Sequence, residues 1–212
     1  MASCARWNPC CQKPSRRSHC MVDAIGGDLE LATVGLGQAY VAGRMQRVEL
    51  GPGAPRVYVD FAHTPQAIAA ALQAVDAPRR IVVLGCGGDR DPHKREPMGE
   101  AAARFADVVI ATDDNPRSED PGAIRAELIK GAQQAVRQHG LATDVIDGGD
   151  RRSAIRLALQ IALSSDVVAI LGKGHELGQE VAGTVLPFSD PDVAAEEWAV
   201  LHPDLGRPGT TP

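Results

Sequence analysis

The 212-residue sequence predicts an α/β fold, a Rossmann-like, mostly parallel sheet covered by helices. Three apolar runs carry the prediction: RIVVLGC at 80–86, DVVIAT at 107–112 and DVVAILG at 166–172. Each is short, rich in branched residues and continuous rather than alternating, which is typical of strands buried on both faces. Helix-like stretches separate the runs, and strands that alternate with helices at this spacing form parallel sheets.

The elements are predicted in order from residue 44. Segments 44–50 and 56–62 are rich in β-formers and are joined by the turn sequence GPGAP, which predicts a hairpin or two adjacent strands. A helix is expected from Thr64, the N-cap, with Pro65 at its first position. Further helices are predicted at 96–106, 121–140 and 150–163. The small and apolar residues of 21–42 are compatible with a short helix, which four glycines disfavour.

The length predicts one domain at 43–200, preceded by a leader at 1–42 and followed by a flexible tail at 201–212. The leader contains four of the five cysteines, Cys4, Cys10, Cys11 and Cys20, beside His19. Their spacing does not match the paired C-x2-C pattern of zinc sites, so we expect no metal site and a segment that is either partly disordered or a remnant of a preceding domain. The fifth, Cys86, is expected to be a buried small hydrophobe.

The composition excludes two classes of partner. A net charge of −5 and an aromatic content of 3% argue against nucleic-acid binding. No apolar run approaches the roughly 20 residues of a membrane helix, so we expect a soluble, cytoplasmic protein with no membrane partner.

Charged or glycine-rich segments follow each predicted strand. Asp60 and His63 lie at the end of the first, and the other ends carry GCGGDRDPHKR, DDNPR and GKGHE. Loops are usually polar, so any one of these is unremarkable alone. Because the carboxyl ends of parallel strands share one edge of a sheet, four together predict a common ligand site.

The segment GCGGDRDPHKR is neither a Walker loop nor a dinucleotide fingerprint, because neither glycine spacing is present. Its glycines would let a ligand approach the main chain closely. Its charges are equally compatible with a solvated loop that neutralises itself. Arg90 is the candidate ligand group, because a guanidinium offers a carboxylate two parallel hydrogen bonds.

The segments DDNPR and GKGHE carry groups suited to a zwitterion. Pro116 biases Asn115 toward extended geometry, so that Asn115 and Arg117 are presented in a defined arrangement. Carboxylates bind an ammonium group, whereas amide and guanidinium groups bind a carboxylate. The structural alternative is an Asx-type turn that caps the helix near residue 121. In GKGHE, Glu176 is a candidate for a ligand ammonium, and His175 is interpreted as a structural, hydrogen-bonded histidine.

In this order, the motifs GRMQRV, VDFAHTP, GCGGDRD-x3-R-x2-MG, DDNPR, GKGHE and FSD resemble the third domain of the Mur ligases, specifically the meso-diaminopimelate-adding MurE type. The resemblance covers about Gly43 to Trp198. It implies that diaminopimelate is held by Arg90, Asp114, Asn115, Pro116, Arg117, Gly172 and Glu176. It also implies that Arg44, Asp60 and His63 reach ATP, although Phe61 departs from the family's usual tyrosine.

The family reaction, by the same resemblance, is phosphorylation of a UDP-sugar peptide carboxylate by ATP, followed by attack of the incoming amino group. The phosphate-binding loop, the magnesium site and the UDP-sugar site belong to two preceding domains, which would be the partners of this chain. We therefore expect no catalytic residue here and no ligation by the isolated chain. The alternative is a stand-alone diaminopimelate-binding or regulatory module. A folylpolyglutamate synthase-type domain is disfavoured, because DNPR and GKGHE occur together.

Overall fold

The computed structural model describes residues 41–204. The expectations for the cysteine-rich leader, for a helix within 21–42 and for the tail after 204 lie outside the described residues. The domain boundaries expected at residues 42 and 200 stay predictions. Among the described residues, no helix combines the length and the apolar character needed to cross a membrane.

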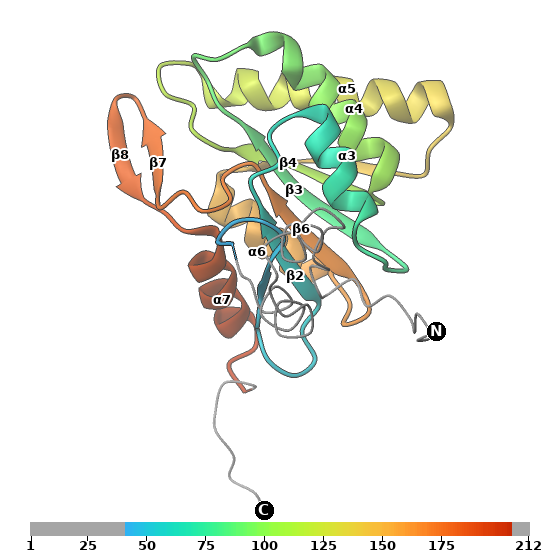
Figure 1. Cartoon of the computed structure of the whole chain (residues 1–212), viewed down its shortest axis with the longest axis vertical. Helices are drawn as coiled ribbons and strands as arrows, with labels where there is room; N and C mark the ends of the chain where they lie inside the picture. Colours follow the sequence, from blue (N-terminus) through green and yellow to red (C-terminus); the bar gives the residue numbers. More distant parts are fainter. Residues whose placement is uncertain (1–40, 205–212) are drawn as a thin grey trace, which may run out of the picture. The chain divides into compact units, whose positions relative to one another are not determined.

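Six strands form one sheet in the order β1-β2-β6-β3-β4-β5 (Figure 1). Its strands are β1 (Gln46–Val48), β2 (Arg56–Asp60), β3 (Arg80–Cys86), β4 (Val108–Asp113), β5 (Asp144–Gly149) and β6 (Val167–Leu171). Strand β1 is antiparallel to β2, and all other neighbouring pairs are parallel. The predicted mostly parallel sheet is confirmed, and so are the two adjacent strands joined by GPGAP.

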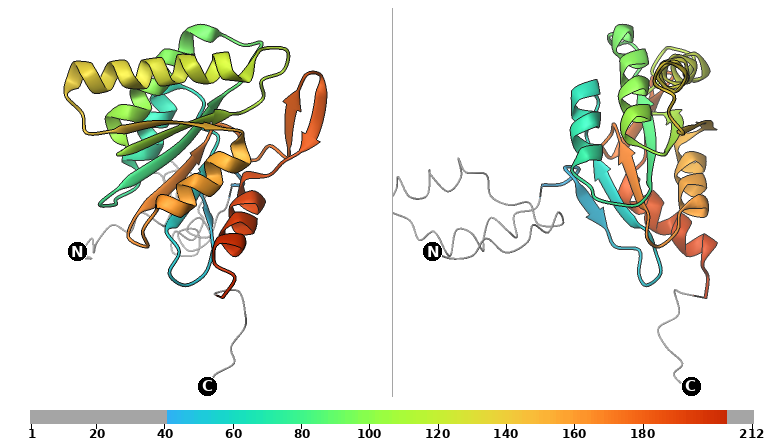
Figure 2. Two further views of the ribbon diagram at one scale, coloured as in Figure 1. Left: turned by 180° about the vertical axis from the view of Figure 1, so that it is seen from behind. Right: turned by 90° about the vertical axis from the view of Figure 1, so that its right-hand side faces the viewer.

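Helices cover both faces of the sheet, as Figure 2 shows. They are α3 (Pro65–Gln73), α4 (Arg95–Phe105), α5 (Pro121–His139), α6 (Arg151–Ile161) and α7 (Asp190–Leu201). Successive strand residues point to opposite faces. Leu84 and Leu171 therefore pack with side chains from α3, α4 and α5, whereas Val83 and Ile170 pack with side chains from α6 and α7. Burial on both faces explains why these strands are continuous apolar runs.

Side-chain caps start the helices close to the strand ends. The Thr64 hydroxyl accepts a hydrogen bond from the Ala67 backbone N–H at 3.2 Å, which confirms the predicted start of α3. Asp120 caps α5 in the same way, and Asp150 caps α6. Each cap satisfies a backbone donor that the first helical turn leaves unpaired.

Besides the single-turn 3-10 helix η1 (Pro92–Lys94), four elements were not predicted from the sequence. They are the edge strand β5, the hairpin strands β7 (Gly178–Val181) and β8 (Thr184–Pro187), and helix α7. Strand β5 mixes Asp and Gly with apolar residues because it is only half buried. The hairpin is largely exposed, with Val185 at 67%, so no buried apolar pattern marks it. Helix α7 does carry a start signal in Ser189, its N-cap, followed by Pro191.

Two glycines bring α4 and α5 into backbone contact. A Cβ atom on Gly99 would lie 2.0 Å from the Leu128 carbonyl oxygen, and one on Gly131 would lie 2.0 Å from the Glu96 carbonyl oxygen. No other residue fits at this separation. Because α4 follows the loop after β3 and α5 follows the loop after β4, this contact sets the spacing of two loops of the candidate site.

Candidate functional site

The loops that follow β2, β3, β4 and β6 form one cleft at the carboxyl edge of the sheet. Its volume is about 350 Å³. The lining residues are Phe61, His63, Gly87, Arg90, Lys94, Asp114, Asn115, Arg117, Gly172 and Glu176. The structure thus brings together six of the seven residues predicted for diaminopimelate, with His63 beside them. The seventh, Pro116, is buried and does not line the cleft.

The loop after β4 presents its polar groups in different directions. Asp114 is 7% exposed. The Asn115 side chain donates through Nδ2 to Glu176 Oε2 at 2.8 Å, and its Oδ1 accepts from the Glu180 backbone N–H at 2.9 Å. The capping of α5 falls to Asp120 instead. The Asx-turn alternative therefore does not apply to Asn115, which is held across the cleft.

Arg117 is fixed by contacts on two sides. Its Nη1 donates to the Gly88 carbonyl oxygen at 2.7 Å, and its Nε donates to Glu180 Oε2 at 3.1 Å. Its backbone joins the hairpin, because the Arg117 N–H donates to the Glu180 carbonyl and the Arg117 carbonyl accepts from the Ala182 N–H. With φ at +53°, Arg117 is left-handed, a conformation that costs free energy outside glycine and that these bonds stabilise. Neither Glu180 nor this hairpin contact was foreseen from the sequence.

Gly85, near the end of β3, and Gly88, in the loop after it, make room for protein rather than for ligand. A Cβ atom on Gly88 would lie 2.1 Å from the Pro116 carbonyl oxygen, and one on Gly85 would lie 2.9 Å from Asp114 Cβ. For these two positions, the expectation that the glycines admit a ligand to the main chain is corrected. The glycines let the β3 and β4 loops pack against each other.

Most charges of the β3 loop are committed to the protein. Asp89 accepts from the Ser118 hydroxyl at 2.7 Å, and the buried Arg95 binds both carboxylate oxygens of Glu119. Lys94 donates to the His63 carbonyl oxygen at 3.3 Å. Arg90 is the exception: it is exposed, and within residues 41–204 it has no hydrogen bond or ion pair. These charges pair with other segments and not with one another, which corrects the interpretation of a solvated loop that neutralises itself, whereas Arg90 remains available to a ligand.

Lys173 lies beneath the cleft, and sequence reasoning gave it no role. Its side chain is fully buried. Its Nζ donates to Asn115 Oδ1 and Glu176 Oε2, both at 3.2 Å, and to the Gly178 carbonyl oxygen at 2.6 Å. The glycines on both sides of Lys173 were the only signal in the sequence that this lysine occupies a tightly packed loop.

Burial dominates the electrostatics of the cleft floor. Loss of hydration raises the pKa of Asp114 above its ordinary value, although the positive charges of Arg151 and Lys173 act in the opposite direction. Gly172 lies against this carboxylate, because a Cβ atom there would be 2.7 Å from Asp114 Oδ2. An ammonium ligand would supply the counter-charge that Asp114 needs to ionise.

The residues that the resemblance assigns to ATP lie around the end of β2, and one of them, His63, lines the cleft. Asp60 is buried and accepts from the Met45 backbone N–H at 2.7 Å. The Arg44 guanidinium carbon lies 4.9 Å from the centre of the Phe61 ring. His63 is exposed, with its Nδ1 2.7 Å from the Phe61 carbonyl oxygen. His175 is exposed as well, and its ring is tilted against Phe61 rather than enclosed in the core.

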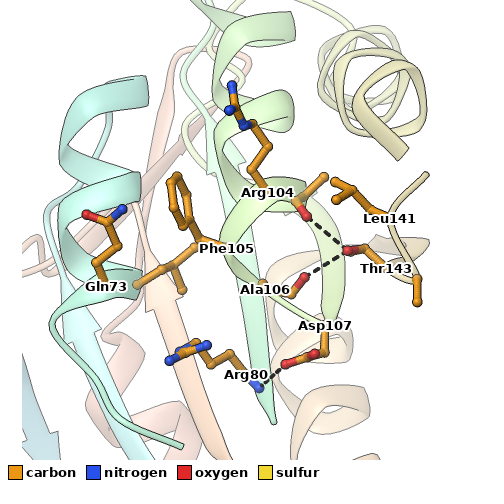
Figure 3. Close-up of a pocket in the computed structure, with 11 residues that line it drawn as sticks. Gln73, Arg80, Arg104, Phe105, Ala106, Asp107, Leu141 and Thr143 are labelled. Carbon is orange, nitrogen blue, oxygen red and sulfur yellow. Dashed lines mark hydrogen bonds between the residues drawn. The ribbon is translucent and has the colours of Figure 1, made fainter. Parts of the chain in front are cut away.

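A second cavity of about 420 Å³ lies at the opposite, amino edge of the sheet (Figure 3). Its polar groups already serve the fold. The Thr143 hydroxyl lies within hydrogen-bonding distance of the carbonyl oxygens of Ala103 and Ala106, and Asp107 accepts from the Arg80 backbone N–H. The carboxyl-edge cleft is therefore the stronger candidate, since it alone of the two contains an arginine without a partner among the described residues.

Comparison with known proteins gives consistent results. Residues 43–174 match the family described as Mur ligase, glutamate ligase domain. A UDP-N-acetylmuramoyl-L-alanyl-D-glutamate--2,6-diaminopimelate ligase of Chelativorans sp. is 50% identical over 152 residues, which are 70% of this chain and 29% of the relative. One from Corynebacterium glutamicum is 45% identical over 169 residues, covering 78% of this chain and 32% of the relative. The chain spans about a third of the length of these relatives.

Solved structures agree with this comparison. A UDP-N-acetylmuramoyl-L-alanyl-D-glutamate--2,6-diaminopimelate ligase superposes with a TM-score of 0.64 and 33% identity, over 87% of this chain and 37% of that one. E. coli FolC in complex with DHPP and ADP has a TM-score of 0.53 at 19% identity, over 76% of this chain and 37% of that one, a likeness of fold alone. The chain thus belongs to the Mur ligase family, of which it contains the C-terminal domain.

Proposed function

We propose that this chain is the amino-acid-binding, C-terminal domain of an ATP-dependent ligase that adds meso-diaminopimelate to UDP-N-acetylmuramoyl-L-alanyl-D-glutamate in cytoplasmic peptidoglycan synthesis. One observation carries the proposal: guanidinium, carboxylate and amide groups from separate loops line a single cleft. The names of relatives 45–50% identical to the chain support the choice of amino acid.

The cleft offers a partner for each kind of charge on diaminopimelate. Asp114 and Glu176 supply carboxylates for an ammonium group, and Arg90 and Arg117 supply guanidinium groups for carboxylates. Two of the five N–H donors of Arg117 bind Glu180 and Gly88, so its orientation is set before the ligand arrives. Such preorganisation reduces the entropy that is lost on binding.

The residues at the end of β2 fit a nucleotide. Asp60 uses one carboxylate oxygen, Oδ2, for the Met45 N–H, which leaves the other for a hydroxyl donor, and Arg44 is an exposed cation beside an aromatic ring. ATP supplies the phosphoryl group that activates the acceptor carboxylate. The part of this domain is to hold the incoming amine in a fixed position, because misplacement by about 1 Å can cost a hundredfold in rate.

We further propose that the triphosphate and Mg²⁺ are held mainly outside residues 43–200, by domains that act as partners of this one. The chain contains no G-x4-G-K-[ST] loop to hold the phosphates. Purified 212-residue protein should therefore release no ADP from ATP in the presence of acceptor and diaminopimelate. Sustained ATP turnover would refute this part of the proposal and would leave the proposed amino-acid site unaffected.

Isothermal titration with meso-diaminopimelate and with L-lysine tests the amino-acid site. Lysine lacks the second carboxylate, so it loses charge-assisted bonds worth about 1.5–3 kcal/mol each, and we expect its binding to be about ten- to a hundredfold weaker. The variant Arg90→Ala should weaken diaminopimelate binding by a similar factor and leave stability unchanged, because Arg90 is exposed and has no partner among residues 41–204.

Arg137→Ala is the matched control, since Arg137 is also exposed but lies near the end of α5, away from the cleft. It should bind diaminopimelate like the wild type. Equal binding of diaminopimelate and lysine, or no binding of either, would refute the proposed substrate. An identical affinity of the Arg90→Ala and Arg137→Ala variants would remove Arg90 from the site.

A further inference from the structure

The ammonium group of Lys173 is fully enclosed and fully bonded. An ammonium has three donors, and those of Lys173 are directed at Asn115 Oδ1, Glu176 Oε2 and the Gly178 carbonyl oxygen. Loss of any one acceptor would leave a buried donor unpaired. The three acceptors are therefore held in fixed positions around the Lys173 ammonium.

The three acceptors belong to different parts of the cleft wall. Asn115 lies in the loop after β4, Glu176 in the loop after β6, and Gly178 at the start of the hairpin. The Asn115 Oδ1 accepts from Lys173 and from the Glu180 backbone N–H, while its Nδ2 donates to Glu176. These bonds allow only one orientation of the Asn115 amide. The Lys173 ammonium bonds to a residue of each loop, Asn115 after β4 and Glu176 after β6.

We propose that Lys173 is a positioning residue of the amino-acid site, which binds no substrate itself but fixes Asn115 and Glu176 and balances one of the two carboxylates of the cleft floor. The proposal rests on the proposed function, which assigns those side chains to diaminopimelate. It extends the site to a lysine that the ligand does not touch.

The charges on the floor agree with this role. Lys173 Nζ lies 3.7 Å from Asp114 Oδ1 and 3.2 Å from Glu176 Oε2, so one cation faces two carboxylates. The other charged groups near Asp114 are Arg151 from α6 and Asp190 from α7, which bind each other. One negative charge is left, and one ligand ammonium neutralises it. Without Lys173 the cleft floor would carry two uncompensated negative charges, and Asp114 would be harder to ionise.

The test replaces Lys173 by Met, which keeps the chain length and removes the charge and all three donors. Lys130→Met is the matched control, because Lys130 is 65% exposed on α5 and, within the described part of the chain, its ion pair is with Glu96. Diaminopimelate binding is measured by titration between pH 5 and 8. The Asn115 side-chain amide is followed by ¹⁵N NMR without ligand.

We expect Lys173→Met to weaken diaminopimelate binding about tenfold or more. We also expect the pH midpoint of binding to move upward, which a general loosening of the fold would not produce. The Asn115 amide signals should shift in this variant and stay in place in Lys130→Met. Unchanged affinity and midpoint, or unshifted Asn115 signals, would overturn the proposal.

The experiment distinguishes a wrong substrate from a wrong role for Lys173. If wild type binds no diaminopimelate but the Asn115 signals still depend on Lys173, the substrate is wrong and the positioning role stands. If Lys173→Met does not fold, the Lys173 ¹⁵Nζ signal of the wild-type protein is measured instead. A buried, hydrogen-bonded ammonium should give a slowly exchanging signal near pH 7. Absence of that signal would refute the enclosed arrangement.

Discussion

Gly131 lies at the backbone contact between α4 and α5, and Gly131→Ala tests whether that contact sets the stability of the domain. A Cβ atom there would lie 2.0 Å from the Glu96 carbonyl oxygen, and an ordinary contact begins at about 3.4 Å. The obstacle is backbone on a packed helix, so no side chain can rotate away. The two helices would have to separate.

The magnitude follows from two opposing effects. Alanine gains about 1 kcal/mol over glycine within a helix. Overpacking costs about 1–3 kcal/mol, and a backbone obstacle places this site at the upper end. We therefore expect a net loss of about 2 kcal/mol, which lowers the Tm by roughly 4–8 °C for a domain of this size.

Gly122→Ala is the matched control because it makes the same chemical change at the start of the same helix. A Cβ atom on Gly122 would meet its nearest neighbours, the Asp120 carboxylate oxygens, at 3.5 Å. We expect unchanged or slightly higher stability for this variant. Urea and thermal unfolding followed by circular dichroism measure both. A Gly131→Ala variant as stable as the wild type, or an equal loss of unfolding free energy in both variants, would contradict a backbone clash between α4 and α5.

Three other outcomes follow from the buried and paired charges. Asp190→Asn should cost about 3 kcal/mol or more in urea unfolding, because it leaves the fully buried guanidinium of Arg151 without its carboxylate. Asp114→Asn should weaken diaminopimelate binding about tenfold or more and at the same time raise the free energy of unfolding at pH 7. Burial raises the pKa of Asp114, so the folded state binds its proton more tightly and stability falls as pH rises from the ordinary aspartate pKa through the raised one. A hydrogen bond from Arg156 is the main cause that lowers the pKa of Glu197, so the carboxylate stabilises the fold above the ordinary glutamate pKa and this stabilisation is lost as pH falls through the lowered pKa. Glu197→Gln should remove that part of the acid sensitivity.

Each of these three predictions has a result that contradicts it. Asp190→Asn with wild-type stability would show that Arg151 finds another counter-charge. If the Asp114→Asn variant is less stable than the wild type and binds diaminopimelate with unchanged affinity, the Asp114 carboxylate stabilises the fold and does not bind the ligand. Unfolding free energies of Glu197→Gln that fall between pH 6 and pH 3 as steeply as those of the wild type would show that Glu197 contributes nothing to the acid transition.

Much of the fold followed from local pattern. The runs at β3, β4 and β6 are apolar because both faces of each strand are buried, and that property can be read along the chain. The start of α3 was equally readable from Thr64 and Pro65. The hairpin β7–β8 was not, because exposed strands have no buried face to impose a pattern. Edge strand β5 was not readable for a different reason: it is only half buried and mixes Asp and Gly with its apolar residues.

The candidate site also has a part that the sequence determined and a part that only the tertiary structure decided. By itself, the sequence determined that charged loops follow four strands that share one edge, because parallel connectivity leaves their carboxyl ends no other place. Only the tertiary structure decided that Arg90 is exposed with no partner among residues 41–204 and that Lys173 is enclosed. The burial of a charge depends on partners from other elements, and Asn115, which binds the Lys173 ammonium, lies 58 residues away in the chain.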